Sequence, residues 1–143
     1  LRSCVLEALE LGYRLFDTAQ MYGNEREWGT RSGAAAYRAA ELFVTTKLHR
    51  PSASYARAKQ GIEASLNALQ LDFIDLLLIH EPYREAEEMY PALEEAYRAG
   101  RLRAIGVSNF NASRYEAFRR ACTVIPTVNQ VEAHIFFSAR ETA

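Results

Sequence analysis

Five short stretches of aliphatic and β-branched residues recur along the chain, and each is followed by a polar or ionisable residue. Stretches of this kind are typical of buried parallel strands. Their ends are 30, 33, 28 and 22 residues apart, which suits a repeating strand-and-helix unit. The stretches cover residues 14–16, 42–46, 74–79, 103–107 and 126–128, and the residues that follow are Asp17, Lys47, His80, Ser108 with Asn109, and Asn129 with Gln130. The pattern predicts an α/β fold with about five parallel strands alternating with helices.

The segments between these stretches have helical periodicity. Gly100 stands where a left-handed helix cap is expected, and Asn24 and Asn111 are expected N-caps of the helices that follow them. One predicted helix face holds Ala58, Ile62, Ser65, Leu66 and Leu69; a second holds Met89, Leu93, Ala96 and Tyr97; a third helix runs through Tyr115, Phe118 and Cys122. No Pro-, Gly- or Ser-rich linker divides the chain, so residues 1–143 are expected to form a single domain.

Composition narrows the classes of partner. The chain has a formal net charge of −1 and no long basic run, which argues against nucleic acid or an anionic membrane as a partner. No apolar run approaches the ~20 residues that span a bilayer. The chain opens inside a predicted helix and shows no secretory leader. We therefore expect a cytoplasmic location, and we expect the sequence to be an internal piece of a longer protein.

Several other features have simple structural interpretations. Cys4 and Cys122 are too few for a disulfide framework and are expected to be buried, reduced thiols. The three histidines have no recognisable metal-ligand spacing, so no metal site is expected. Tyr55 and Lys59 form a Tyr-x-x-x-Lys pair, but no glycine-rich phosphate turn accompanies it, and a solvated helix face is the expected setting. An exposed acidic face is also predicted, with Glu85, Glu87, Glu88, Glu94 and Glu95 balanced by Arg98 and Arg101.

The polar residues after the strands are the sharpest functional signal. In a barrel of parallel strands, all carboxyl ends open on one face, and that face holds the active site. One polar residue after one strand would be unremarkable. Five in series predict that an acid, an amine, an imidazole, a hydroxyl and amides converge on one pocket.

Five blocks in order also resemble the aldo-keto reductase family, and the chain is most similar to the bacterial branch that includes diketogluconate reductases. The blocks are Asp17-Thr-Ala-Gln-Met-Tyr-Gly-Asn-Glu25, Thr46-Lys-Leu48, Asp75-Leu-Leu-Leu-Ile-His80, Gly106-Val-Ser-Asn-Phe110 and Val128-Asn-Gln-Val-Glu132. The resemblance implies a partial (β/α)8 barrel that lacks the first strand and the last two, since the whole fold takes ~250 residues and eight strands.

The resemblance also implies a chemistry: reduction of a small carbonyl compound by a nicotinamide cofactor, with NADP(H) favoured over NAD(H). It makes Tyr22 the general acid and Lys47 the cation that stabilises the resulting phenolate. Asp17 would pair with Lys47, and His80 would orient the substrate carbonyl. Ser108, Asn109 and Gln130 would hold the nicotinamide carboxamide.

Two departures from the family pattern are visible: Glu81-Pro82 stands where many relatives have an aromatic residue, and Ile135 stands where many have proline. The expected absence of three strands predicts that this piece alone binds cofactor weakly and is inactive or poorly soluble, because sheet edges would be exposed. Two other functions compete with the reductase. One is a non-catalytic nicotinamide-binding regulatory subunit of the same fold, as in potassium-channel β subunits. The other is a metal-dependent barrel hydrolase.

Overall fold

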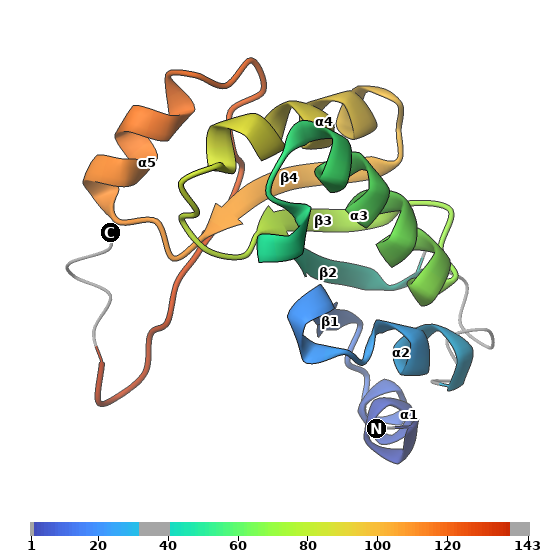
Figure 1. Cartoon of the computed structure of the whole chain (residues 1–143). Helices are drawn as coiled ribbons and strands as arrows, with labels where there is room; N and C mark the ends of the chain where they lie inside the picture. The colour runs from blue at the N-terminus through green and yellow to red at the C-terminus, as the bar shows by residue number, and fades with distance from the viewer. Residues whose placement is uncertain (1, 32–40, 138–143) are drawn as a thin grey trace.

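The computed structural model describes residues 2–31 and 41–137. Its helices and strands alternate as the sequence predicts (Figure 1). The helices are α1 (Arg2–Glu10), α2 (Glu25–Arg31), α3 (Tyr55–Leu69), α4 (Ala86–Arg98) and α5 (Ala112–Arg119), with 3-10 turns η1 (Gln20–Tyr22) and η4 (Arg50–Ser52). The strands are β1 (Leu15–Asp17), β2 (Phe43–Leu48), β3 (Ile74–Ile79), β4 (Leu102–Ser108) and β5 (Asn129–Gln130).

The five strands form one sheet in the order β1-β2-β3-β4-β5, and every neighbouring pair is parallel. Each strand therefore follows its sequence predecessor across the sheet, as in a singly wound barrel. The sheet curls into part of a barrel (Figure 1). The predicted fold class, a partial (β/α)8 barrel with about five strands, is confirmed.

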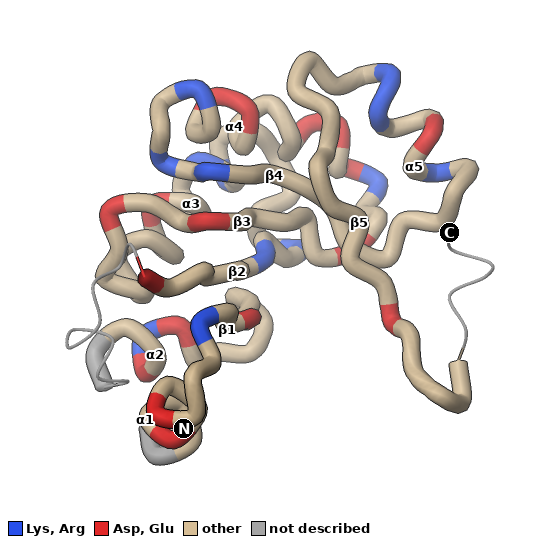
Figure 2. Tube along the Cα trace, turned by 180° about the vertical axis from the view of Figure 1, so that it is seen from behind, with Lys and Arg blue, Asp and Glu red and all other residues tan. Residues whose placement is uncertain are grey.

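Helices α3 and α4 cover one face of the sheet (Figure 1). All six residues of β3 are buried, as expected for a central strand of a parallel sheet. The predicted apolar face of α3 is confirmed, because the buried residues of this helix are Ala58, Ile62, Ser65, Leu66 and Leu69. Seen from behind, the opposite face of the strands has no helix over it in the described part of the chain (Figure 2).

Strand β5 was expected at residues 126–128. In the structure it is one residue shorter and lies further along the chain, at Asn129–Gln130. Its pairing with β4 begins earlier, because the Thr127 amide donates to the Ile105 carbonyl at 2.9 Å. The two strands approach closely at Gly106, where an added Cβ would collide with the carbonyl oxygen of Val128. A side chain at this position would force the strands apart.

The helix caps expected at Asn111 and Gly100 are confirmed, whereas the Asn24 side chain accepts from the Thr18 hydroxyl at 2.6 Å. Asn111 caps α5 by accepting a hydrogen bond from the Arg114 amide at 2.8 Å. Gly100 follows α4 with a φ of 73°, the left-handed region that glycine adopts without strain. Asn24 precedes α2, and its backbone carbonyl accepts from the Trp28 amide.

Three predictions of burial were wrong. Tyr97 is exposed, because α4 turns Tyr90 and Glu94 inward instead. Cys4 is exposed, because α1 directs Val5 and Leu9 to the core. Cys122 is only partly buried; desolvation raises its pKa to about 12, which keeps the thiol protonated.

The acidic face on α4 is also not uniformly exposed. Glu94 is 5% exposed and accepts hydrogen bonds from the Thr123 and Val124 amides at 2.7 and 2.8 Å. Burial opposes ionisation of Glu94, but these bonds outweigh it and hold its pKa below the ordinary value. Glu94 therefore ties α4 to the segment before β5.

Two charged residues of the predicted acidic face and its expected partners form ion pairs with α3 instead of with each other. Glu95 pairs with Lys59 of α3, and Arg101 pairs with Glu63 of α3. These ion pairs join α3 to α4 and to the turn that follows it. None of the helices in the described part of the chain is long and apolar enough to cross a membrane.

Candidate active site

The carboxyl ends of the strands surround a pocket of about 210 Å³. Of the seven residues that follow the strands, five line this pocket, and Tyr22 lines it with them. Asp17 is linked to the lining through its contacts with Lys47 and Gln130, and Asn129 is not a lining residue. The lining residues are Tyr22, Lys47, His80, Ser108, Asn109, Gln130, Val131 and Glu132. Val131 and Glu132 were not expected to take part, although both belong to the last of the five sequence blocks.

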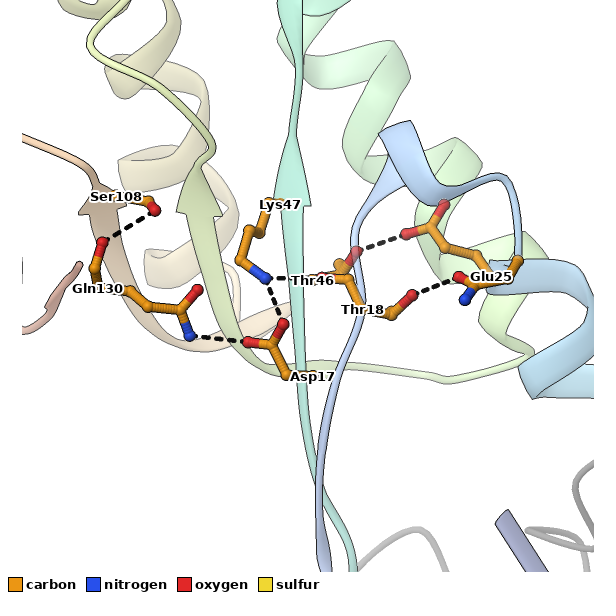
Figure 3. Close-up of polar contacts among 8 residues, drawn as sticks. Asp17, Thr18, Glu25, Thr46, Lys47, Ser108 and Gln130 are labelled. Atoms are coloured by element: carbon orange, nitrogen blue, oxygen red, sulfur yellow. Dashed lines mark hydrogen bonds and ion pairs between the residues drawn. The ribbon is translucent and has the colours of Figure 1, made fainter. Parts of the chain in front are cut away.

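Lys47 occupies the centre of the polar contacts (Figure 3). Its side chain is 3% exposed and forms an ion pair with Asp17 of β1. Its ammonium also donates to the Thr18 carbonyl at 3.2 Å. A lysine is seldom buried without a carboxylate beside it, and Asp17 is that carboxylate here.

Tyr22 lies on η1, between β1 and α2, and is half-exposed. The Lys47 ammonium nitrogen is 5.4 Å from the centre of the Tyr22 ring. The His80 ring lies 5.7 Å from the same ring, centre to centre, in an edge-on arrangement. A phenol, an ammonium and an imidazole from three separate segments therefore meet at one side of the pocket.

His80 follows β3 and is 6% exposed. Burial lowers its pKa, and the Lys47 charge lowers it further, while Glu81 acts in the opposite direction. The imidazole is therefore neutral at pH 7. Its Nδ1 is buried and has no hydrogen-bond partner among the described residues, which leaves Nε2 as the nitrogen available to a ligand.

The side chains at the ends of β4 and β5 are held by hydrogen bonds with defined directions. The Ser108 hydroxyl donates to the backbone carbonyl of Gln130 at 2.9 Å (Figure 3). The Gln130 amide nitrogen donates to Asp17 at 2.8 Å, and the Asn109 amide nitrogen donates to Glu81 at 2.9 Å. Since a carboxylate only accepts, these contacts fix which end of each amide is nitrogen and which is oxygen.

Asn109 has a φ of 62°, in the left-handed region that asparagine adopts more readily than most residues. Its neighbour Phe110 is held by Asn129, whose side chain accepts from the Phe110 amide and donates to the Phe110 carbonyl. Asn129 therefore braces the turn after β4 rather than facing the pocket.

The segment that carries Tyr22 is anchored on both sides, a feature the sequence reasoning missed. Before Tyr22, the Gln20 amide donates to the Gly61 carbonyl and the Ser65 hydroxyl of α3, each at 2.9 Å. After it, the Thr46 hydroxyl donates to the buried Glu25 at 2.6 Å (Figure 3). The one sequence feature that could have indicated this anchoring is that Gln20 and Glu25 lie in the same sequence block as Tyr22.

The second Tyr–Lys pair lies elsewhere, as expected. Tyr55 and Lys59 are both bonded to Glu95 on the outer surface of α3 and α4. Both side chains are largely exposed, and no strand end lies among these contacts. The described residues also contain no cluster of three or more metal-ligating side chains.

A singly wound parallel sheet with a tyrosine, a paired lysine and a histidine at its carboxyl ends defines a class: a (β/α) barrel with ionisable side chains gathered at its mouth. Comparison with protein families gives the more specific assignment. Residues 2–143 match the model of the aldo/keto reductase family. The chain belongs to the aldo/keto reductase family.

Individual relatives agree. Glyoxal reductase of Bacillus subtilis is 38% identical over 138 residues, which cover 96% of this chain and 50% of that protein. An aldo-keto reductase enzyme from a Medee basin deep-sea metagenome library has a TM-score of 0.93 at 39% identity, over 99% of this chain and 53% of that one. The Bombyx mori aldo-keto reductase in complex with NADP has a TM-score of 0.84 at 34% identity, over 92% of this chain and 48% of that one. The chain thus spans about half the length of the relatives it matches.

Proposed function

We propose that the complete protein reduces an aldehyde or ketone to an alcohol by hydride transfer from a nicotinamide cofactor, NADP(H) in preference to NAD(H). The observation that carries this proposal is the meeting of Tyr22, Lys47 and His80 in one pocket. Family membership and the reductases among the relatives support the same reaction type. The Bombyx mori relative contains NADP, which supports the choice of cofactor.

In this proposal Tyr22 is the general acid that protonates the carbonyl oxygen. Proton loss leaves negative charge on the phenol oxygen, and the Lys47 ammonium nearby stabilises that charge. Asp17 holds Lys47 in place through their ion pair. Neutral His80 offers a ring N–H to the carbonyl oxygen and so orients the substrate toward Tyr22.

The residues at the ends of β4 and β5 fit a nicotinamide carboxamide. The single proton of the Ser108 hydroxyl is used on the Gln130 carbonyl, so its oxygen is free to accept. Asn109 and Gln130 direct their nitrogens to carboxylates and keep their oxygens as acceptors. Three acceptors at one edge of the pocket suit the NH2 group of a carboxamide. When bound, the cofactor supplies the hydride, and the chain supplies position and polarity.

Tyr22→Phe in the complete protein tests the proposal. This change removes the acidic proton and keeps the ring against His80. We expect carbonyl reduction to fall by ~10²–10⁴-fold, the usual contribution of a general acid, while cofactor still binds. Tyr55→Phe is the matched control, because Tyr55 also lies beside a lysine but outside the pocket, and it should leave reduction unchanged.

The same pair of variants separates the enzyme from a regulatory subunit of the same fold. A regulatory subunit would bind nicotinamide cofactor with little turnover, and Tyr22→Phe would not alter that turnover. Equal carbonyl reduction by wild type and Tyr22→Phe would therefore overturn the catalytic assignment.

A further inference from the structure

The charges around the pocket are unevenly distributed. Among the described lining residues, Lys47 is the one lysine or arginine, and Asp17 neutralises it. His80 is neutral because burial lowers its pKa. The pocket interior therefore presents almost no net charge from these three residues.

One carboxylate lines the pocket and a second is bonded to a lining residue. Glu132 lines the pocket directly and lies on the segment that continues from β5. Among the described residues its carboxylate contacts the His134 ring, at 2.8 Å, and its side chain is 67% exposed. Glu81 directly follows His80 and is bound to the pocket residue Asn109. Within the described ranges, neither carboxylate forms an ion pair with a lysine or arginine.

The Glu81 charge reaches the groups of the site. Burial raises the pKa of Tyr83, and the Glu81 charge raises it further while Arg50 opposes both; the Glu81 charge also opposes the lowering of the His80 pKa. Glu81 is partly buried, so solvent screens it less than a carboxylate on a fully exposed surface. Among the described residues, a negatively charged group entering this pocket would meet the Glu132 carboxylate in the lining, the Glu81 carboxylate bonded to Asn109, and one lysine that is already paired with Asp17.

We propose that Glu81, together with Glu132, makes the mouth of this pocket select against carbonyl substrates that carry a carboxylate. The preferred substrates are neutral or cationic aldehydes and ketones. That these compounds are substrates rests on the function proposed above, whereas the negative charge at the mouth of the pocket does not depend on it. Glu81 acts as a specificity-determining residue through its charge, and it also keeps the Asn109 amide in place.

The experiment uses the complete protein and two aldehydes of nearly equal shape, 4-carboxybenzaldehyde and 4-formylbenzamide. For each aldehyde, kcat/KM and the dissociation constant are measured, the latter by calorimetry, which requires no turnover. The variants are Glu81→Gln and Glu132→Gln. Glutamine at position 81 can still accept from Asn109, so Glu81→Gln removes the charge and keeps the contact. Glu63→Gln, whose carboxylate pairs with Arg101 on the outer surface, is the matched control.

We expect wild type to prefer the neutral amide in both measurements. Glu81→Gln should reduce that preference roughly five-fold, because it removes the repulsion from one charge in a partly solvated site. Glu132→Gln should reduce it by a smaller factor, because Glu132 is more exposed. Raising the salt concentration should narrow the wild-type preference, and Glu63→Gln should leave it unchanged.

The two readouts separate this inference from the proposed function. If neither aldehyde is reduced but the ratio of dissociation constants shifts in Glu81→Gln, the reductase proposal fails and the acidic mouth stands. If wild type reduces aldehydes but both ratios in Glu81→Gln stay within two-fold of wild type, the inference is overturned and the reductase proposal stands.

Discussion

Replacing Lys47 by methionine tests the electrostatic part of the site. Methionine has a similar length and no charge, so the core position is filled and the ammonium is lost. Asp17 loses its ion pair in this variant, but it is one-third exposed and keeps the hydrogen bond from Gln130. The fold should therefore survive the change.

The size of the effect follows from the geometry. The Lys47 nitrogen lies 5.4 Å from the centre of the Tyr22 ring, and at an effective dielectric constant of about 20 a full charge there is stabilised by roughly 3 kcal/mol. If about half of the charge has developed in the transition state, the stabilisation is roughly 1.5 kcal/mol. Carbonyl reduction should then fall by roughly ten-fold, or by up to ~150-fold if the full charge develops.

The assay is kcat/KM for aldehyde reduction by the complete protein, with thermal unfolding followed in parallel. Lys59→Met is a control of nearly equal geometry, because the Lys59 nitrogen is 5.5 Å from the Tyr55 ring and pairs with Glu95. It should leave reduction unchanged. Reduction by Lys47→Met within two-fold of wild type, in a folded protein, would refute the role given to the ammonium.

Three further predictions concern the residues that position the site. Glu94→Gln should lower the free energy of unfolding at pH 7 by about 1–3 kcal/mol in urea titrations, because Thr123 and its neighbour lose a charged acceptor. Folding lowers the pKa of Glu94, so its carboxylate contributes fully to the free energy of unfolding above pH 4.5, the ordinary pKa. That contribution disappears as the pH falls through the lower pKa of the folded state. A difference in unfolding free energy between wild type and Glu94→Gln that grows on acidification would contradict this reasoning. Gly106→Ala should cost about 3 kcal/mol by the same titration, because the added methyl meets the Val128 carbonyl, and an unchanged midpoint would argue against the close approach of β4 and β5. Gln20→Ala should lower kcat roughly ten-fold with cofactor affinity retained, since it releases η1 from α3; equal loss of both would indicate general damage to the fold.

The sequence predicted which polar side chains gather at one edge of the sheet, because parallel strands align their carboxyl ends. Once residues 74–79 were recognised as a strand, the position of His80 followed from the chain direction alone. The pairing of Lys47 with Asp17 was implied by the family resemblance, and the structure places the two residues on the neighbouring strands β1 and β2. Strand order and strand ends alone predicted only that the polar residues share one edge of the sheet.

The sequence predicted burial less well where distant segments decide it. Helix α4 has apolar residues on more than one side, and its periodicity alone did not show that Glu94 rather than Tyr97 turns inward. Glu94 is buried because donors at Thr123 and Val124, about 30 residues away, replace water around its carboxylate. The anchoring of Gln20 on α3 escaped prediction for the same reason, since its partner Ser65 lies 45 residues away.

The most direct test of the reductase proposal follows the hydride itself. The complete protein is given an aldehyde and NADPH that carries deuterium at the transferable C4 position, and the alcohol is examined by mass spectrometry and NMR. We predict one deuterium on the carbinol carbon, and its absence in the Tyr22→Phe reaction over the same time. An alcohol whose new carbon-bound hydrogen comes from water, or no alcohol at all, would contradict the account.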